Sequence, residues 1–167
     1  MEISEDLKAK INKIKWVITD CDGVLTDTGV YYNDDGELLK RFSIRDGMGV
    51  ERLRNILNIE TAIVTGENSM PLKRRAEKLK IKELYLYVKN KKKCLEEFVV
   101  KHHVDNDEIA YIGDDFNDEE VLRMVGLAAC PADALEPIKE LCDYICTVKG
   151  GNGAFRDLAE LIIKCRT

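Results

Sequence analysis

Short apolar runs alternate along the chain with longer segments in which apolar residues recur at helical spacing. The short runs are typical of buried parallel strands and the longer segments of amphipathic helices. Strands are predicted at residues 16–19, 61–64, 84–86, 109–112, 127–129 and 144–146. Helices are predicted at residues 4–14, 48–57, 71–79, 92–102, 118–125, 135–141 and 154–164. This alternation predicts an α/β fold in which helices cover both faces of a parallel sheet.

One segment interrupts the alternation of strands and helices. Residues 29–41 read GVYYNDDGELLKR, with β-forming residues on both sides of a turn at residues 33–36. This pattern predicts a β-hairpin, which should project from the end of the sheet where the first strand stops. Because no linker rich in Pro, Gly or Ser divides the chain, we expect residues 1–167 to form one domain.

Composition and charge narrow the classes of function. Hydrophobic residues make up 45% of the 167 residues and charged residues 34%, which is typical of a globular protein. The net charge of −5 argues against nucleic acid or an anionic membrane as the main partner. No apolar run approaches the roughly 20 residues that span a bilayer, and the charged N-terminal segment lacks a signal-peptide centre. We therefore expect a cytoplasmic protein whose six cysteines are reduced.

Acidic, hydroxyl and cationic side chains follow four of the predicted strands. Asp20 follows the first strand, Thr65 the second, and a lysine-rich segment at residues 89–93 the third. Asp114 follows the fourth strand and Asp118 lies a few residues later. Ligands of an open parallel sheet bind beyond the carboxyl ends of its strands, so we expect these groups to meet at one edge.

Such a group of side chains is suited to phosphoryl transfer. Crowded carboxylates repel one another unless a hard cation neutralises them, and Mg²⁺ prefers oxygen ligands. Asp20 would attack phosphorus, and Asp22 would protonate the leaving alcohol and later activate water. Thr65 and a lysine would bind the phosphoryl oxygens. Asp114 would complete the metal site, with Asp118 supporting it from behind.

The same residues resemble the four motifs of the haloacid dehalogenase-like phosphatases. The matching segments are DCDGVLTD at residues 20–27, Thr65-Gly66, a lysine near position 91 and GDDFND at residues 113–118. The resemblance covers nearly the whole chain and implies a Rossmann-like sheet and Mg²⁺ as the cofactor. It implies a phosphorylated Asp20, with Mg²⁺ held by Asp20, Asp114 and the backbone carbonyl of Asp22. The remaining motif residues that would support this metal site are Asp115 and Asp118.

The third motif is the one that departs from the family pattern. The usual Gly-x-x-Asp-Lys run stands here as Tyr87-Val88-Lys89-Asn90-Lys91, which makes Lys91 the best match. The neighbouring lysines that compete with it are Lys89, Lys92 and Lys93.

The absence of a cap domain narrows the resemblance to a subgroup. Only the hairpin at residues 29–41 separates motif one from motif two, and the next interval is too short for a cap. With Arg45-Asp46-Gly47 and the glycine-rich residues 150–154, the chain resembles the 3-deoxy-D-manno-octulosonate 8-phosphate phosphatase group. That resemblance implies a homotetramer in which the hairpins form a central barrel and neighbouring subunits help to cover each active site.

The residues after Thr65 bear on the substrate. Octulosonate phosphatases typically carry Gly-Arg there, whereas this chain has Gly66-Glu67. Glu67 and Lys78 resemble the pair in the branch that acts on 2-keto-3-deoxynononate 9-phosphate, so we expect this sialic-acid-like substrate. The alternative is 3-deoxy-D-manno-octulosonate 8-phosphate. The candidate substrate-binding residues are Glu67, Lys78, Gly66, Arg45 and Thr26.

A different class of protein, the receiver-type signalling module, also combines acidic residues, Thr and Lys on a parallel sheet. Its phosphorylated aspartate has no acid or base partner two residues later. Asp22 and the late GDDFND segment therefore favour a phosphatase.

Overall fold

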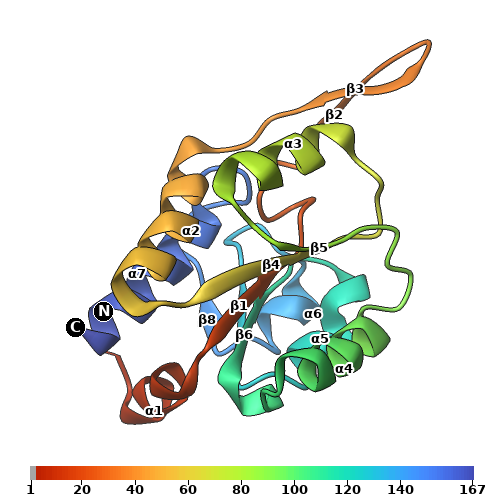
Figure 1. Ribbon diagram of the computed structural model, residues 1–167. Coiled ribbons are helices and arrows are strands. Elements are labelled where there is room, and N and C mark those ends of the chain that lie inside the picture. The colour runs from red at the N-terminus through yellow and green to blue at the C-terminus, as the bar shows by residue number, and fades with distance from the viewer. Residues whose placement is uncertain (1–2) are drawn as a thin grey trace.

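A six-stranded parallel sheet forms the centre of the molecule (Figure 1). The structure is a computed structural model and describes residues 3–167. The strand order β5-β4-β1-β6-β7-β8 places β1 between β4 and β6 in the middle of the sheet. The strands are β1 Trp16–Thr19, β4 Glu60–Val64, β5 Glu83–Tyr85, β6 Ile109–Ile112, β7 Leu127–Cys130 and β8 Tyr144–Ile145. The predicted α/β fold with a Rossmann-like parallel sheet and no cap is confirmed.

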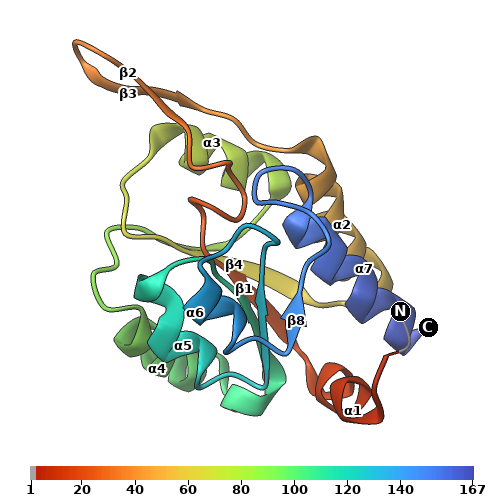
Figure 2. The same cartoon turned by 180° about the vertical axis from the view of Figure 1, so that it is seen from behind.

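Helices cover both faces of the sheet (Figures 1 and 2). One layer consists of α1 Glu5–Lys13, α2 Ile44–Leu57, α3 Met70–Leu79 and α7 Ala154–Arg166. The other consists of α4 Lys91–His102, α5 Glu119–Leu122 and α6 Glu136–Lys139. Successive strand residues point to opposite faces, so Val17 packs in the first core and Ile18 in the second. A strand buried on both faces is apolar throughout, which explains the short continuous runs in the sequence.

Side-chain caps explain where the longer helices begin. Ser43 and Ser69 accept hydrogen bonds from the N–H groups of the first turns of α2 and α3. Asn90 does the same for α4, so Lys91 is the first residue of that helix. The cap at Ser43 starts α2 at Ile44, four residues before the predicted start. The two glycines of α2, Gly47 and Gly49, weaken the helical pattern in the sequence, which explains the late predicted start. In the structure, Gly49 allows α2 to pack closely on Phe155 of α7.

Two predicted helices are shorter than their sequence patterns indicated. In place of the predicted helix at residues 118–125, a 3₁₀ turn at Phe116–Asp118 is followed by the short α5. The side chain of Asp118 accepts hydrogen bonds from the N–H groups of Asp114 and Asp115. The 3₁₀ turn that carries Asp118 therefore includes the first residue of the predicted helix. The segment 135–141 contains only α6. Local polar contacts therefore determine the helix ends on this face of the sheet.

The predicted hairpin consists of β2 Val30–Asn33 and β3 Gly36–Lys40, an antiparallel pair with an irregular register between Tyr31 and Tyr32. Figures 1 and 2 show it standing away from the body of the molecule, next to α3. All six cysteines are free. Within residues 3–167, no helix has the length and apolar character needed to cross a membrane.

Candidate active site

A cleft of about 260 Å³ lies at the carboxyl ends of β1, β4 and β6. Parallel strands end at the same edge, so the side chains that follow them are brought together although they are far apart in the sequence. The lining residues are Asp20, Asp22, Thr28, Thr65, Gly66, Glu67, Asp114, Asp115 and Asn117. Of these, Thr28 and Asn117 were not predicted from the sequence.

Asp20 directly follows the central strand β1 and is 4% exposed. Its Oδ1 accepts a hydrogen bond from the N–H of Cys21 at 2.7 Å and lies 3.0 Å from Nζ of Lys91. Burial, together with the negative charge of Asp118, raises the pKa of Asp20 to about 7, although Lys91 acts in the opposite direction. The ionised carboxylate therefore benefits from further positive charge at this position.

Lys91 is the lysine that reaches the site. Its Nζ lies 2.7 Å from Oδ1 of Asp118 as well as 3.0 Å from Asp20, and the side chain is buried. Lys92 and Lys93 instead pair with acidic residues on the surface, and Lys89 is exposed. The start of α4 thus selects one member of the lysine run.

Asp118 is fully buried and accepts four hydrogen bonds. Lys91 and the hydroxyl of Tyr111 donate to Oδ1, and the N–H groups of Asp114 and Asp115 donate to Oδ2. These donors occupy the lone pairs of a carboxylate. Asp118 therefore orients the loop after β6 and Lys91, and we do not assign it as a direct metal ligand.

Asp114 has the properties of a metal ligand. Its buried Oδ1 has no hydrogen-bond partner among the described residues. Burial, followed by the charges of Asp20 and Asp118, raises the pKa of Asp114 to about 8. Oxygens of Asp20, Asp114 and Asp118 lie within 4.8 Å of one another, so a hard cation held by Asp20 and Asp114 would offset the repulsion among the three carboxylates.

The carboxylate of Asp22 is held by two neighbours, of which Thr26 belongs to the first motif and Lys40 does not. Thr26 donates its hydroxyl proton to Oδ1 at 3.1 Å, and Nζ of Lys40 lies 2.9 Å from Oδ1 and 2.8 Å from Oδ2. Thr26 is fully buried, so it contacts Asp22 and does not line the cleft as a substrate-binding residue. Lys40 is buried, but sequence reasoning missed it because nothing in its local sequence distinguishes it from lysines that lie on the surface.

The other predicted substrate-binding residues separate into two sets. Thr65 is buried after β4, and its Oγ1 accepts from the N–H of Glu67 at 3.2 Å, so both line the cleft with Gly66. Lys78 and Arg45 are exposed on α3 and α2 and lie outside the lining of the cleft. Of the two residues predicted to contact the sugar acid, Glu67 lines the cleft of one chain and Lys78 does not.

A parallel sheet that places these carboxylates, a threonine and a lysine at one edge is typical of proteins that transfer phosphoryl groups, and comparisons with known proteins identify the class. The chain belongs to the haloacid dehalogenase-like hydrolases and is a phosphoric monoester hydrolase. Residues 77–156 match the family model. The 3-deoxy-D-manno-octulosonate 8-phosphate phosphatase of Haemophilus influenzae is 35% identical over 160 residues, which cover 96% of this chain and 88% of the relative.

Solved structures show the same relationship. The 3-deoxy-D-manno-octulosonate 8-phosphate phosphatase of Yersinia pestis superposes with a TM-score of 0.93 at 34% identity, covering 97% of this chain and 87% of its own. The enzyme of that name from Moraxella catarrhalis, solved with magnesium, phosphate and KDO, gives 0.91 at 35% identity, with 95% and 90% covered. This membership favours the enzyme over a receiver-type signalling module.

Proposed function

We propose that this protein is a Mg²⁺-dependent phosphatase that hydrolyses 3-deoxy-D-manno-octulosonate 8-phosphate. The observation that carries the proposal is the group of Asp20, Asp114 and Lys91 at the carboxyl edge of the sheet, in which Asp20 and Lys91 are buried and Asp114 is half-buried. The relatives support the substrate, because they carry this phosphatase name and one of them holds magnesium, phosphate and KDO.

Mg²⁺ would be held by the carboxylates of Asp20 and Asp114. When bound, it supplies positive charge that favours ionised Asp20 and polarises a phosphoryl oxygen. The unpartnered Oδ1 of Asp114 and the raised pKa values of both carboxyls support this site. Asp118 and Lys91 hold the surrounding groups in place through their ion pair.

The reaction would proceed in two steps at Asp20. An oxygen of Asp20 bonds to phosphorus while the bond from phosphorus to the sugar oxygen breaks, and Asp22 gives that oxygen its proton. Asp22, now ionised, takes a proton from water, whose oxygen displaces Asp20 and releases inorganic phosphate. Thr65 and Lys91 would bind the oxygens of the phosphoryl group during both steps. Thr65 lines the cleft, and the buried Lys91 places Nζ 3.0 Å from Oδ1 of Asp20, which supports these roles.

The comparisons favour the eight-carbon substrate over the nine-carbon substrate that the sequence motif had suggested. That expectation depended on Glu67 and Lys78 acting together. Glu67 lines the cleft, but Lys78 is exposed outside it. Because only Glu67 of this pair lines the cleft of one chain, the pair does not establish a preference for the nine-carbon sugar acid.

We also propose that the enzyme acts as a homotetramer assembled through its hairpins. The hairpin exposes four large apolar side chains, with exposures between 44% and 70%. They are Tyr31, Tyr32, Leu38 and Leu39. Apolar groups on a projecting element are typical of an interface between proteins.

The proposal is tested by comparing kcat/KM for the eight-carbon and nine-carbon sugar-acid phosphates, with Mg²⁺ present or removed by a chelator. We expect higher kcat/KM for the octulosonate and loss of activity without metal. The Asp20→Asn variant should lose on the order of 1,000-fold or more in kcat, because the amide is a poor nucleophile. Full activity in that variant would exclude Asp20 as the nucleophile, and a nine-carbon preference would refute the substrate.

A further inference from the structure

Lys40 is the last residue of β3, at the base of the hairpin, and its side chain is only 1% exposed. Its Nζ lies within hydrogen-bond distance of both carboxylate oxygens of Asp22, at 2.9 and 2.8 Å. Glu37, from the same strand, approaches Nζ at 3.4 Å. A buried ammonium group is costly unless it is paired, so these carboxylates account for the position of Lys40.

The contact fixes the direction of the Asp22 side chain. Lys40 engages both oxygens, and Thr26 donates a further hydrogen bond to Oδ1. Asp22 nevertheless lines the cleft, with its side chain 27% exposed. Lys40 does not line the cleft and so has no direct path to the substrate within this chain. Any influence of Lys40 on the reaction must therefore act through Asp22.

The base of the hairpin is in turn fixed to the body of the molecule. Ser69, the N-cap of α3, donates its hydroxyl proton to Glu37. On the other side of Lys40, Arg41 donates to Asp27 and to the carbonyl of Gly151. These contacts give Lys40 a defined position relative to the loop that follows β1.

We propose that Lys40 is a positioning residue that holds the Asp22 carboxyl in the orientation required for proton transfer. This inference rests on the proposed function, in which Asp22 protonates the leaving sugar oxygen and then takes a proton from the attacking water. Loss of Lys40 would leave Oδ2 of Asp22 without its partner and remove one of the donors to Oδ1, where the Thr26 hydroxyl remains, so the carboxyl would be held less firmly. This would impair the second step even when the first needs no acid.

p-Nitrophenyl phosphate separates the two steps, because p-nitrophenolate leaves as a stable anion without a proton from Asp22. Formation of the aspartyl phosphate then gives a burst of p-nitrophenolate, and hydrolysis of the aspartyl phosphate sets the later steady rate. For Lys40→Met we expect a burst rate within about 3-fold of wild type and a steady rate slowed about 10-fold to 100-fold. With the sugar-acid phosphate, kcat should fall by a similar factor or more, with little change in KM.

Three further variants make the result specific. Lys40→Arg keeps the charge and the double contact, so we expect it to recover most of the steady rate. Lys40→Gln gives the same comparison as Lys40→Met if the apolar variant folds poorly. Arg41→Met removes one attachment of the hairpin base but keeps the Ser69–Glu37 hydrogen bond and the Lys40–Asp22 pair, so both rates should stay near those of wild type.

The outcomes distinguish this inference from the proposed function. If wild type shows no Mg²⁺-dependent hydrolysis of either substrate, the proposed function fails. If wild type is active but burst and steady rates fall together in the Lys40 variants, Lys40 has only a structural role. Unchanged rates in Lys40→Met, or an equal slow step in Arg41→Met, would also overturn the assignment of Lys40.

Discussion

Gly23 shows how a single backbone position shapes the metal site. Its φ of +94° is a conformation that residues with a side chain rarely adopt. A Cβ at this position would lie 2.0 Å from Oδ2 of Asp114, the proposed metal ligand. The loop after β1 can therefore approach the loop after β6 only because residue 23 has no side chain.

Replacement of Gly23 by alanine should displace Asp114 and weaken Mg²⁺ binding. We expect the Mg²⁺ concentration for half-maximal activity to rise about 10-fold or more, together with a loss of stability on the order of 1–3 kcal/mol. Activity titrations with Mg²⁺ and denaturant unfolding measure the two effects.

Gly36→Ala is the matched control for this variant. Gly36 also has a positive φ, of 116°, but a Cβ there would meet no atom within 4 Å. The two variants share only the backbone strain, so the Mg²⁺ dependence of Gly36→Ala should match that of wild type. A similar shift in both variants would show that Gly23 acts through strain and not through Asp114.

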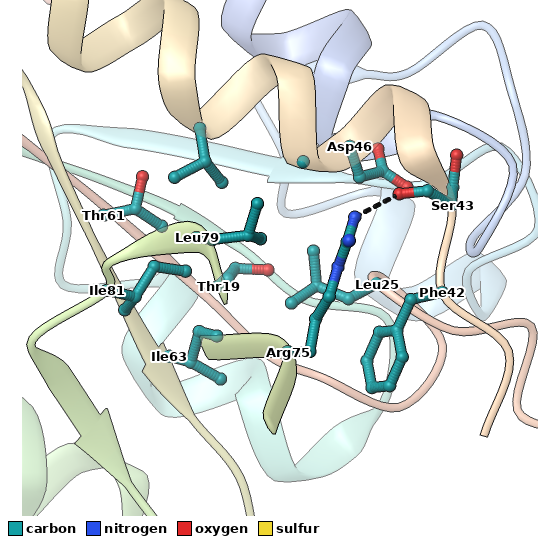
Figure 3. A pocket seen from close by; sticks show the side chains of 12 residues that line it. Thr19, Leu25, Phe42, Ser43, Asp46, Thr61, Ile63, Arg75, Leu79 and Ile81 are labelled. Carbon is teal, nitrogen blue, oxygen red and sulfur yellow. Dashed lines mark hydrogen bonds between the residues drawn. The ribbon is translucent and has the colours of Figure 1, made fainter. Parts of the chain in front are cut away.

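At the scale of elements, Asp46 connects the first turn of α2 with the start of α7. It is 3% exposed, and Oδ1 accepts a hydrogen bond from the N–H of Arg156, whereas Oδ2 has no partner among the described residues. Figure 3 shows Asp46 at the edge of a small cavity beside Ser43, whose carbonyl accepts from Arg75. Burial, the largest cause, raises the pKa of Asp46 to about 6 from 3.8.

This pKa makes a prediction about stability against pH. Because the folded state binds the Asp46 proton more tightly than the unfolded state, its contribution to stability is largest at acid pH and is lost as pH rises through 6. As the pH rises from about 5 to 8, ionisation of Asp46 should lower the free energy of unfolding by about 1 kcal/mol. Asp46→Asn should remove that part of the pH dependence, as measured by urea unfolding in metal-free buffer. An identical dependence in both proteins would contradict the raised pKa.

At the scale of the whole molecule, the hairpin is the surface through which we propose that copies of the chain assemble. The hairpin projects beyond the sheet and helices (Figure 1) and carries exposed apolar side chains, so another chain can cover them without disturbing the core. The proposed homotetramer would bury these side chains and place neighbouring subunits near each open cleft.

Charged residues on the hairpin should therefore disrupt assembly. The double variant Tyr32→Lys with Leu38→Glu should shift the mass measured by light scattering from tetramer to monomer, because each buried charge is costly. Val100→Lys on α4 is the control, because Val100 is 73% exposed but lies on another element. A double variant that remained tetrameric would exclude the hairpin as the assembly surface.

Much of the fold could be predicted because buried parallel strands leave a local signal. Residues 16–19 and 109–112 were predicted with the bounds of β1 and β6, since both strands are apolar runs ended by polar loops. Helix lengths were less predictable. The short α5 depends on contacts of Asp118 that a pattern of apolar residues does not contain.

The sequence by itself determined the parallel sheet, the family motifs and the acidic residues Asp20, Asp22 and Asp114, because these depend on local pattern and residue type. Only the tertiary structure selected Lys91 from its neighbours, turned Thr26 toward Asp22 and kept Lys78 outside the cleft. It also brought Lys40 to Asp22, across 18 positions of sequence. Such contacts depend on how α4, the hairpin and the loop after β1 come together, and a buried charge left unpaired would be costly, which local sequence does not specify.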